Sequence, residues 1–168
     1  MSQGLDRGIL SNNMGYEALK KGKLNQAIVL LKQSVEYCKS VDDWEGEITA
    51  LSNLSEALFK KWADRASPMP DLHASLSSGL FADGMQCVVR VFELCIAHQD
   101  LRDAGIALQD LIIRLERHAG LSQEEAMSVS TQLINEHVGP LLMQNNIWEL
   151  PGPGGFPILR LDKKPPSG

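Results

Sequence analysis

Three segments of this chain align with one another, and this internal repeat constrains the fold more than any other feature. They are residues 13–21, 53–61 and 110–118, which lie at offsets of 40 and then 57 residues. Each unit of a repeat of this size can bury its apolar stripe only against its neighbours. The repeat therefore predicts stacked helical hairpins whose working surface is a groove, in place of an enzyme built around one pocket.

The composition is that of an ordinary soluble globular domain. Of the 168 residues, 43% are apolar and 22% are charged, which is enough for one core. The formal net charge of -5 disfavours nucleic acid and anionic membranes as partners. No apolar run approaches the roughly 18 residues of a spanning helix, and residues 1–4 lack the features of a secretory signal. We therefore expect a cytoplasmic protein, with the nucleus as the alternative location.

The three cysteines predict neither a disulfide framework nor a metal centre. Their number is odd, and the sequence contains no CxxC pair. Cys87, Cys95 and His98 would share one face of a continuous helix and could be read as three metal ligands. The apolar residues around them in the sequence favour buried thiols within a packed stripe instead. We expect reduced cysteines, no metal and no cofactor.

Apolar residues recur at helical spacing up to about residue 148, so the sequence predicts an all-α fold. Four expected helices cover residues 6–20, 42–62, 72–98 and 100–118, and two more begin at residues 25 and 122. Residues 63–71 are expected to form an inserted loop. Asn25 and Asp42 are the expected N-caps of the second and third helices. Gly22 and Gly120 are expected to end helices, and Gly79 and Gly84 are expected weak points within one. A capping box of Ser122 with Glu125 is expected to start the last helix, which should stop or kink at Gly139-Pro140.

Residues 1–148 are thus predicted to form one helical repeat domain, followed by residues 149–168 as an extended tail. From Pro151 to Gly168 the chain holds five prolines and four glycines, too many for a helix or a central strand. The tail also contains the apolar residues Phe156, Ile158 and Leu159. These leave open a self-regulating arrangement in which the tail occupies the groove of its own chain.

Two segments carry the pattern of a known helical repeat. In residues 13–28, NMGYEALKKGKLNQAI, the small residue Gly15 is followed by Gly22 seven positions later and by Ala27 five further on. Residues 45–58, EGEITALSNLSEAL, have the opening of a longer, roughly 40-residue variant, with Ser55 in place of glycine. The pattern resembles the tetratricopeptide repeat. The resemblance implies a short right-handed α-solenoid of antiparallel helix-turn-helix hairpins, whose first helices line a concave surface that binds peptides or proteins.

Under this resemblance, one side of the first helix in each pair lines the groove. The implied groove residues are Asn12, Tyr16, Leu19, Ser52, Glu56, Phe59, Gln109, Ile113 and Glu116. Asn13, Asn53 and Asp110 hold equivalent positions in the three units. Their side chains could serve as hydrogen-bonding groups in the groove, or could contact a neighbouring helix. The third unit departs from the pattern, because Ile112 stands where a small residue is expected.

Lys20, Lys60 and Arg117 are also equivalent positions and could form a cationic rim along the groove. Such a rim would favour an acidic partner. The alternative is that each cation only stabilises the last turn of its own helix by interacting with the helix dipole.

No motif for catalysis is present in the sequence. The four histidines are scattered, and there is no HExxH, no GxSxG and no glycine loop that could hold a phosphate. The sequence therefore predicts no enzyme and no catalytic residue. It predicts an adaptor or scaffold that binds a protein or peptide. The alternative function is a structural subunit, buried constitutively against another chain or in a homo-oligomer.

Overall fold

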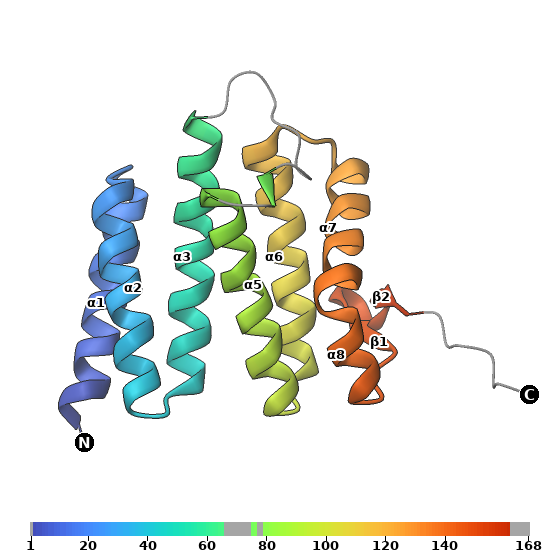
Figure 1. Ribbon diagram of the computed structural model, residues 1–168, viewed down its shortest axis with the longest axis horizontal. Coiled ribbons are helices and arrows are strands. Elements are labelled where there is room, and N and C mark those ends of the chain that lie inside the picture. The colour runs from blue at the N-terminus through green and yellow to red at the C-terminus, as the bar shows by residue number, and fades with distance from the viewer. Residues whose placement is uncertain (1, 66–74, 77–78, 162–168) are drawn as a thin grey trace, which may run out of the picture. The chain divides into compact units, whose positions relative to one another are not determined.

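The chain folds into a series of helices followed by a small β-hairpin (Figure 1). The computed structural model describes residues 2–65, 75–76 and 79–161. Its elements are α1 (Ser2–Lys20), α2 (Leu24–Ser40), α3 (Trp44–Arg65), α5 (Leu80–Ala97), α6 (Leu101–Ala119), α7 (Gln123–His137), α8 (Gly139–Gln144), β1 (Glu149–Pro151), the 3-10 turn η1 (Pro153–Gly155) and β2 (Pro157–Arg160). The all-α prediction is confirmed. The chain divides into two compact units, residues 1–91 and residues 92–168.

In the first unit, α1 and α2 form a hairpin, and α3 packs on both helices (Figure 1). Gly22 takes φ +72° in the turn, a conformation that glycine adopts without strain, so α1 ends where the sequence predicted. The two helices meet closely at Gly15, where an added Cβ would lie 2.7 Å from Cγ of the fully buried Leu31. The small residue of the repeat pattern therefore provides the space for this helix contact.

The predicted N-caps of α2 and α3 are each misplaced. α2 begins at Leu24, so Asn25 lies inside the helix. At α3 the capping residue is Asp43, whose carboxylate accepts a hydrogen bond from the Gly46 amide at 3.0 Å. Asp42 instead takes a left-handed φ of 55° in the turn before it. Aspartate suits both positions, so the sequence alone could not decide which of the two would cap the helix.

α3 and residues 80–91 of α5 pack antiparallel. Near one end the rings of Phe59 and Phe81 lie 5.3 Å apart, and near the other Arg90 Nε donates to Glu47 Oε1 at 3.0 Å. Phe59 is fully buried, and its ring fills the space left by the missing side chain of Gly84. The prediction that Phe59 lines a groove is therefore wrong, because its side chain belongs to the interface between these two helices.

The connection between α3 and α5 differs in part from the prediction. α3 continues to Arg65, so residues 63–65 of the predicted loop (63–71) are helical, and residues 66–71 lie outside the described part of the chain. The helix expected from residue 72 is described from Leu80, directly after Gly79. Gly79 has φ +92°, which an α-helix does not allow, so α5 begins at this predicted weak point.

In the second unit, α6 and α7 have the ends that the sequence predicted. Asp100 caps α6 by accepting a hydrogen bond from the Asp103 amide at 3.1 Å, and Gly120 ends this helix with φ +66°. Ser122 and Glu125 form the predicted capping box at α7. The hydrogen bond from the Ser122 amide lowers the pKa of the Glu125 carboxyl. Helix α7 ends at His137, just before Gly139-Pro140, and α8 starts at Gly139. This confirms the predicted stop.

Residues 149–160 form a packed β-hairpin, so the prediction of an extended tail is wrong for them. β1 pairs antiparallel with β2, Leu150 stands opposite Leu159, and both side chains are buried. The hairpin residues belong to the second compact unit, and the predicted boundary after residue 148 does not separate them from the helices. Residues 162–168 lie outside the described residues.

The hairpin packs on α6 at a glycine. Gly105 faces the Pro151 carbonyl so closely that an added Cβ would overlap the carbonyl oxygen. Pro151 and Pro157 stand opposite each other where the ladder becomes irregular, a place at which strands tolerate proline. Two of the prolines that argued against a strand thus stand at one end of a very short ladder.

Two buried serines provide a matched test of this packing. The Ser34 hydroxyl on α2 donates to the Gly8 carbonyl at 2.7 Å, whereas the equally buried Ser130 hydroxyl on α7 has no hydrogen-bond partner within the described residues. Because a buried polar group without a partner carries its full desolvation cost, we expect Ser130→Ala to raise the free energy of unfolding by about 1 kcal/mol. Ser34→Ala should lower it by about 1 to 2 kcal/mol. Urea unfolding measures both changes, and equal destabilisation by the two variants would contradict the structure.

Candidate functional site

Two of the predicted site residues of the first unit, Asn12 and Asn53, come together where α1 meets α3. Asn53 Nδ2 donates to Asn12 Oδ1 at 3.0 Å, which links two residues 41 positions apart. Of the two roles that the sequence allowed for Asn53, the structure therefore shows the contact with a neighbouring helix. The hydrogen bond fixes the two amides and marks the side of α1 that faces α3.

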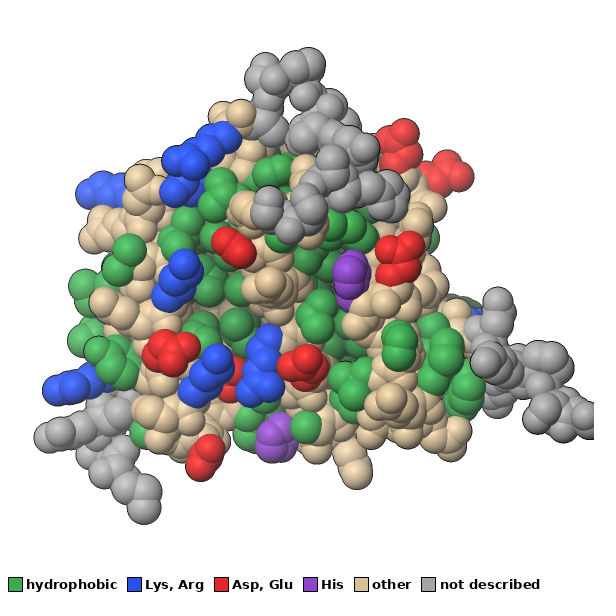
Figure 2. All heavy atoms as spheres, viewed as in Figure 1, with side chains coloured by type: hydrophobic (Ala, Val, Ile, Leu, Met, Phe, Trp, Pro, Cys, Tyr) green, Lys and Arg blue, Asp and Glu red, His purple; other side chains and the backbone are tan. Residues whose placement is uncertain are grey.

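Next to this pair, α1 carries a partly apolar surface. Tyr16 is 45% exposed and Ile9, two helical turns earlier, is exposed by half. We call the exposed residues Ile9, Tyr16 and Lys20, with the half-buried Asn12 and Asn53, the α1/α3 face. Figure 2 shows that, on the side of the molecule facing the viewer, apolar side chains reach the surface beside Lys, Arg and acidic side chains. The α1/α3 face combines apolar, aromatic, amide and cationic residues, so it is chemically mixed, as the sequence predicted from the groove residues.

Lys20 is held on this face by two contacts with its own helix. Its ammonium group forms an ion pair with Glu17 at 2.5 Å and lies 4.9 Å from the centre of the Tyr16 ring. The hydrogen bond with Glu17 raises the pKa of Lys20, and the same hydrogen bond lowers the pKa of Glu17. The charge of Lys20 is therefore already compensated within α1.

The remaining predicted site residues differ in how exposed they are. Leu19 is buried, so it does not line a groove, whereas Ser52, Glu56 and Lys60 on α3 are half-buried. On α6, Gln109 and Asp110 are half-buried, while Ile113, Glu116 and Arg117 are exposed. These α6 residues belong to the second unit, so a groove or cationic row shared by all three repeats stays a prediction.

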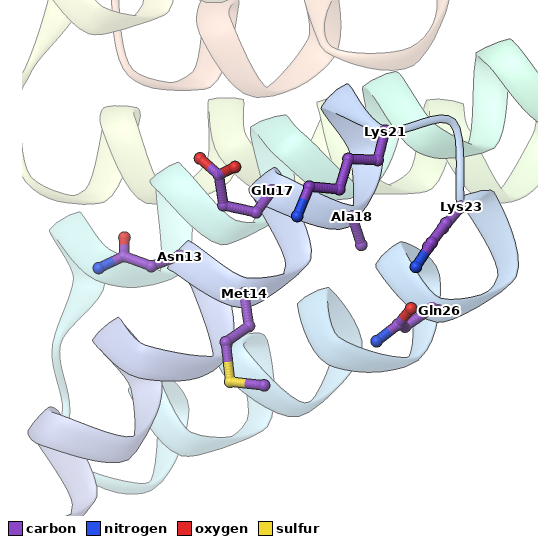
Figure 3. A pocket seen from close by; sticks show the side chains of 7 residues that line it. All are labelled: Asn13, Met14, Glu17, Ala18, Lys21, Lys23 and Gln26. Atoms are coloured by element: carbon purple, nitrogen blue, oxygen red, sulfur yellow. The ribbon is translucent and has the colours of Figure 1, made fainter.

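A hollow that the sequence did not predict lies between the end of α1 and the start of α2 (Figure 3). It has a volume of about 320 Å³ and is lined by Asn13, Met14, Glu17, Ala18, Lys21, Lys23 and Gln26. Of these residues, Asn13 is a predicted site residue, and Lys21 flanks the predicted rim residue Lys20. Met14 lies two positions from Asn12, about 200° around the helix, so the hollow opens away from the α1/α3 face.

The hollow is cationic over an apolar base. Figure 3 shows the ends of Lys21, Lys23 and Gln26 around Ala18, with the Glu17 carboxylate turned away from Lys23 and Gln26. Residues 11–30 contain three lysines and one acidic residue, Glu17, which is paired with Lys20. One sequence signal could have pointed to this site: Leu10 and Met14 are apolar at helical spacing on a side of α1 that the repeat pattern leaves unused.

The cysteines offer no reactive group. All three are buried, and burial raises the pKa of the Cys87 thiol to about 11 and that of Cys95 to about 12. The thiolate is the reactive form, so these thiols are poor nucleophiles near neutral pH. Among the described side chains, no group of three His, Cys, Asp or Glu residues is placed to hold a metal ion.

We expect all three thiols to be unreactive in the native protein. At pH 8 a disulfide reagent such as dithionitrobenzoate should label none of them within minutes and all three after unfolding in guanidinium chloride. A cysteine that reacts at the rate of a free thiol before unfolding would show that its surroundings are more open than the structure indicates.

Neither the models of protein families, nor curated proteins, nor solved structures match this chain. Within the described residues, no helix is both long and apolar enough to cross a lipid bilayer.

Proposed function

We propose that this protein is a non-enzymatic scaffold that binds a protein or peptide partner on the α1/α3 face. The observation that carries the proposal is the exposure of Ile9 and Tyr16 in line on one side of α1. They stand beside the Asn12–Asn53 pair, which offers fixed amide groups at the edge of the apolar surface. Apolar anchors beside polar groups are typical of protein interfaces.

Tyr16 is the expected anchor of this interface. A tyrosine supplies a large contact area with few rotatable bonds, and its hydroxyl group can bond at the wet edge of an interface. The contact of its ring with Lys20 restricts it further, which lowers the entropy lost on binding. The chain would thus present an ordered aromatic group to its partner.

The resemblance to tetratricopeptide repeats supports the same reading, because helix α1 and helix α3 are the first helices of the first two pairs. A peptide lying across both would contact Tyr16 and the half-buried Lys60, and an acidic peptide would gain from the lysine. We place this adaptor in the cytoplasm, with the nucleus as the alternative, and we propose neither a nucleic-acid nor a membrane partner.

Affinity purification with the full chain, followed by mass spectrometry, tests this function. The double variant Ile9→Ser/Tyr16→Ala removes both exposed apolar anchors, and it should lower partner recovery by about tenfold or more. Val29→Ser is the matched control, since Val29 is an equally exposed apolar residue on α2. Unchanged recovery with the double variant, at an unchanged melting temperature, would remove the α1/α3 face from the proposal.

A second candidate function is that of a structural subunit, either of a larger complex or of a homo-oligomer. It is favoured by the exposure of Leu10 and Met14, which lie on another side of α1. Light scattering over a range of concentrations separates the cases. A folded monomer of about 18.5 kDa at every concentration would contradict obligate self-assembly.

A further inference from the structure

The α1–α2 hairpin has an apolar side that no described helix covers. Leu10 is 59% exposed and Met14, one helical turn later, is 48% exposed. Leu30 on α2, one turn after the hollow residue Gln26, is half-buried. We call Leu10, Met14 and Leu30 the end face of the hairpin. Exposed apolar residues in such a row mark a site of interaction more often than isolated ones do.

The shape of the end face suits a helix. The hairpin has two long sides, and on one of them α3 packs against α1 and α2 together. The end face is formed by the same two helices, so a second helix laid along it would contact both of them, as α3 does on the other side. A partner helix laid there would bring one of its ends to the hollow.

The charge of the hollow selects an acidic partner. Lys21 and Lys23 line its edge, while the one carboxylate in the lining, that of Glu17, is paired with Lys20. The chain as a whole carries a net charge of -5, so this cationic spot is a local exception to the overall charge. A carboxylate between the two lysines would gain from both ammonium groups.

The hollow is large enough to admit one long side chain. Its volume is about 320 Å³, against roughly 30 Å³ for one water molecule. Met14, Ala18 and the lysine stems provide apolar contacts for methylene groups, and Gln26 adds an amide that can donate to an oxygen. A glutamate has this combination of an apolar stem and a terminal carboxylate.

We propose that the end face binds an amphipathic helix of another protein, with the apolar stripe of that helix on Leu10 and Met14 and one of its glutamates in the hollow. This surface is distinct from the α1/α3 face, so the two proposals can fail independently. The chain would then offer its partners two sides of α1.

Nuclear magnetic resonance titration of the full chain with two synthetic peptides tests this inference. Both peptides are amphipathic helices of about 20 residues with leucines at three- and four-residue spacing. One carries glutamates along the border of the apolar stripe, and the other carries glutamines at the same positions. We expect the glutamate peptide to shift the amide signals of residues 10–26 and to bind at least about fivefold more tightly at 50 mM NaCl than at 300 mM, because salt screens the ion pairs.

The variant Lys21→Glu/Lys23→Glu should weaken binding of the glutamate peptide by about tenfold, because it reverses both charges at the hollow. Lys32→Glu is its control, since Lys32 is an exposed lysine of α2 outside the hollow. Ile9→Ser/Tyr16→Ala should leave peptide binding unchanged, and this separates failure of the end face from failure of the α1/α3 face.

Four results of the titration would overturn the inference. They are equal binding of the glutamine peptide, binding unaffected by Lys21→Glu/Lys23→Glu, signal shifts confined to α3, and no shift with either peptide. Self-association that Leu10→Ser/Met14→Ser abolishes would also overturn it, because the occupant of the end face would then be a second copy of this chain.

Discussion

Replacing Phe59 with alanine is expected to lower the free energy of unfolding by about 4 kcal/mol. The side chain is fully buried, its ring lies 5.3 Å from that of Phe81, and Gly84 packs directly against it. Deleting the ring removes its burial and leaves a cavity that the helix backbones cannot close. Urea unfolding followed by circular dichroism measures this loss.

Phe156→Ala is the matched control for this experiment. Phe156 is 79% exposed at the end of the 3-10 turn, so the same chemical change should alter stability by less than about 0.5 kcal/mol. If Phe59→Ala instead impaired partner binding and cost less than about 1 kcal/mol of stability, Phe59 would be a groove residue, as the repeat pattern implied.

The variant Gly105→Ala should be nearly as damaging, with a loss of about 3 kcal/mol in the free energy of unfolding. The added methyl group would overlap the Pro151 carbonyl oxygen, and this oxygen belongs to a backbone that is held by the buried Leu150. The hairpin must therefore move away from α6 or α6 must bend. Alanine is otherwise the better helix former, so propensity alone predicts the opposite sign.

Gly139→Ala provides the comparison, because an added Cβ at this position meets no atom within 4 Å. It should be neutral or stabilising by up to about 1 kcal/mol, since Gly139 is the first residue of α8. Hydrogen exchange should also rise in β1 and β2 of Gly105→Ala alone. A stable Gly105→Ala protein with a protected hairpin would show that β1 does not lie on α6 as described.

The helices could be predicted from the sequence because their signals are local. Gly22, Gly120 and the Ser122–Glu125 capping box each act within one helical turn, and each ends or begins a helix in the structure as expected. The close contact at Gly15 was also foreseen, since the repeat pattern places a small residue there. Asp42 shows the limit of such reasoning, because Asp43 competes with it for the same role.

The errors concern contacts between segments that are distant in the sequence. Phe59 occupies a groove position in the repeat pattern, but Gly84 leaves a space in α5 that only a large ring fills. The prediction of an extended tail is wrong for residues 149–160 because the number of prolines and glycines does not show where they stand relative to the strands. Leu150 lies between two exposed residues, but Leu159 follows the half-buried Ile158, so the alternation is too short and too weak to identify a strand.

The candidate site could be predicted only in part, because the repeat pattern identifies local positions but not the contacts between distant segments. Tyr16 and Asn13 are exposed on α1, and Asn53 contacts Asn12 on the neighbouring helix, which is one of the two roles that the sequence allowed for Asn53. The hollow was not predicted, because it depends on how the start of α2 returns along α1 and on where Glu17 turns its carboxylate. Neither feature can be predicted from the spacing of the apolar residues.

We propose that the exposed sides of α1 form the binding surface of this protein. Hydrogen–deuterium exchange of the full chain, measured alone and with the partner recovered by affinity purification, tests it most directly. We predict slower exchange on binding in residues 9–26 of α1 and α2, extending to residues 52–60 of α3 where the α1/α3 face is used. Protection confined to residues 92–161, with α1 exchanging as in the free protein, would contradict the claim.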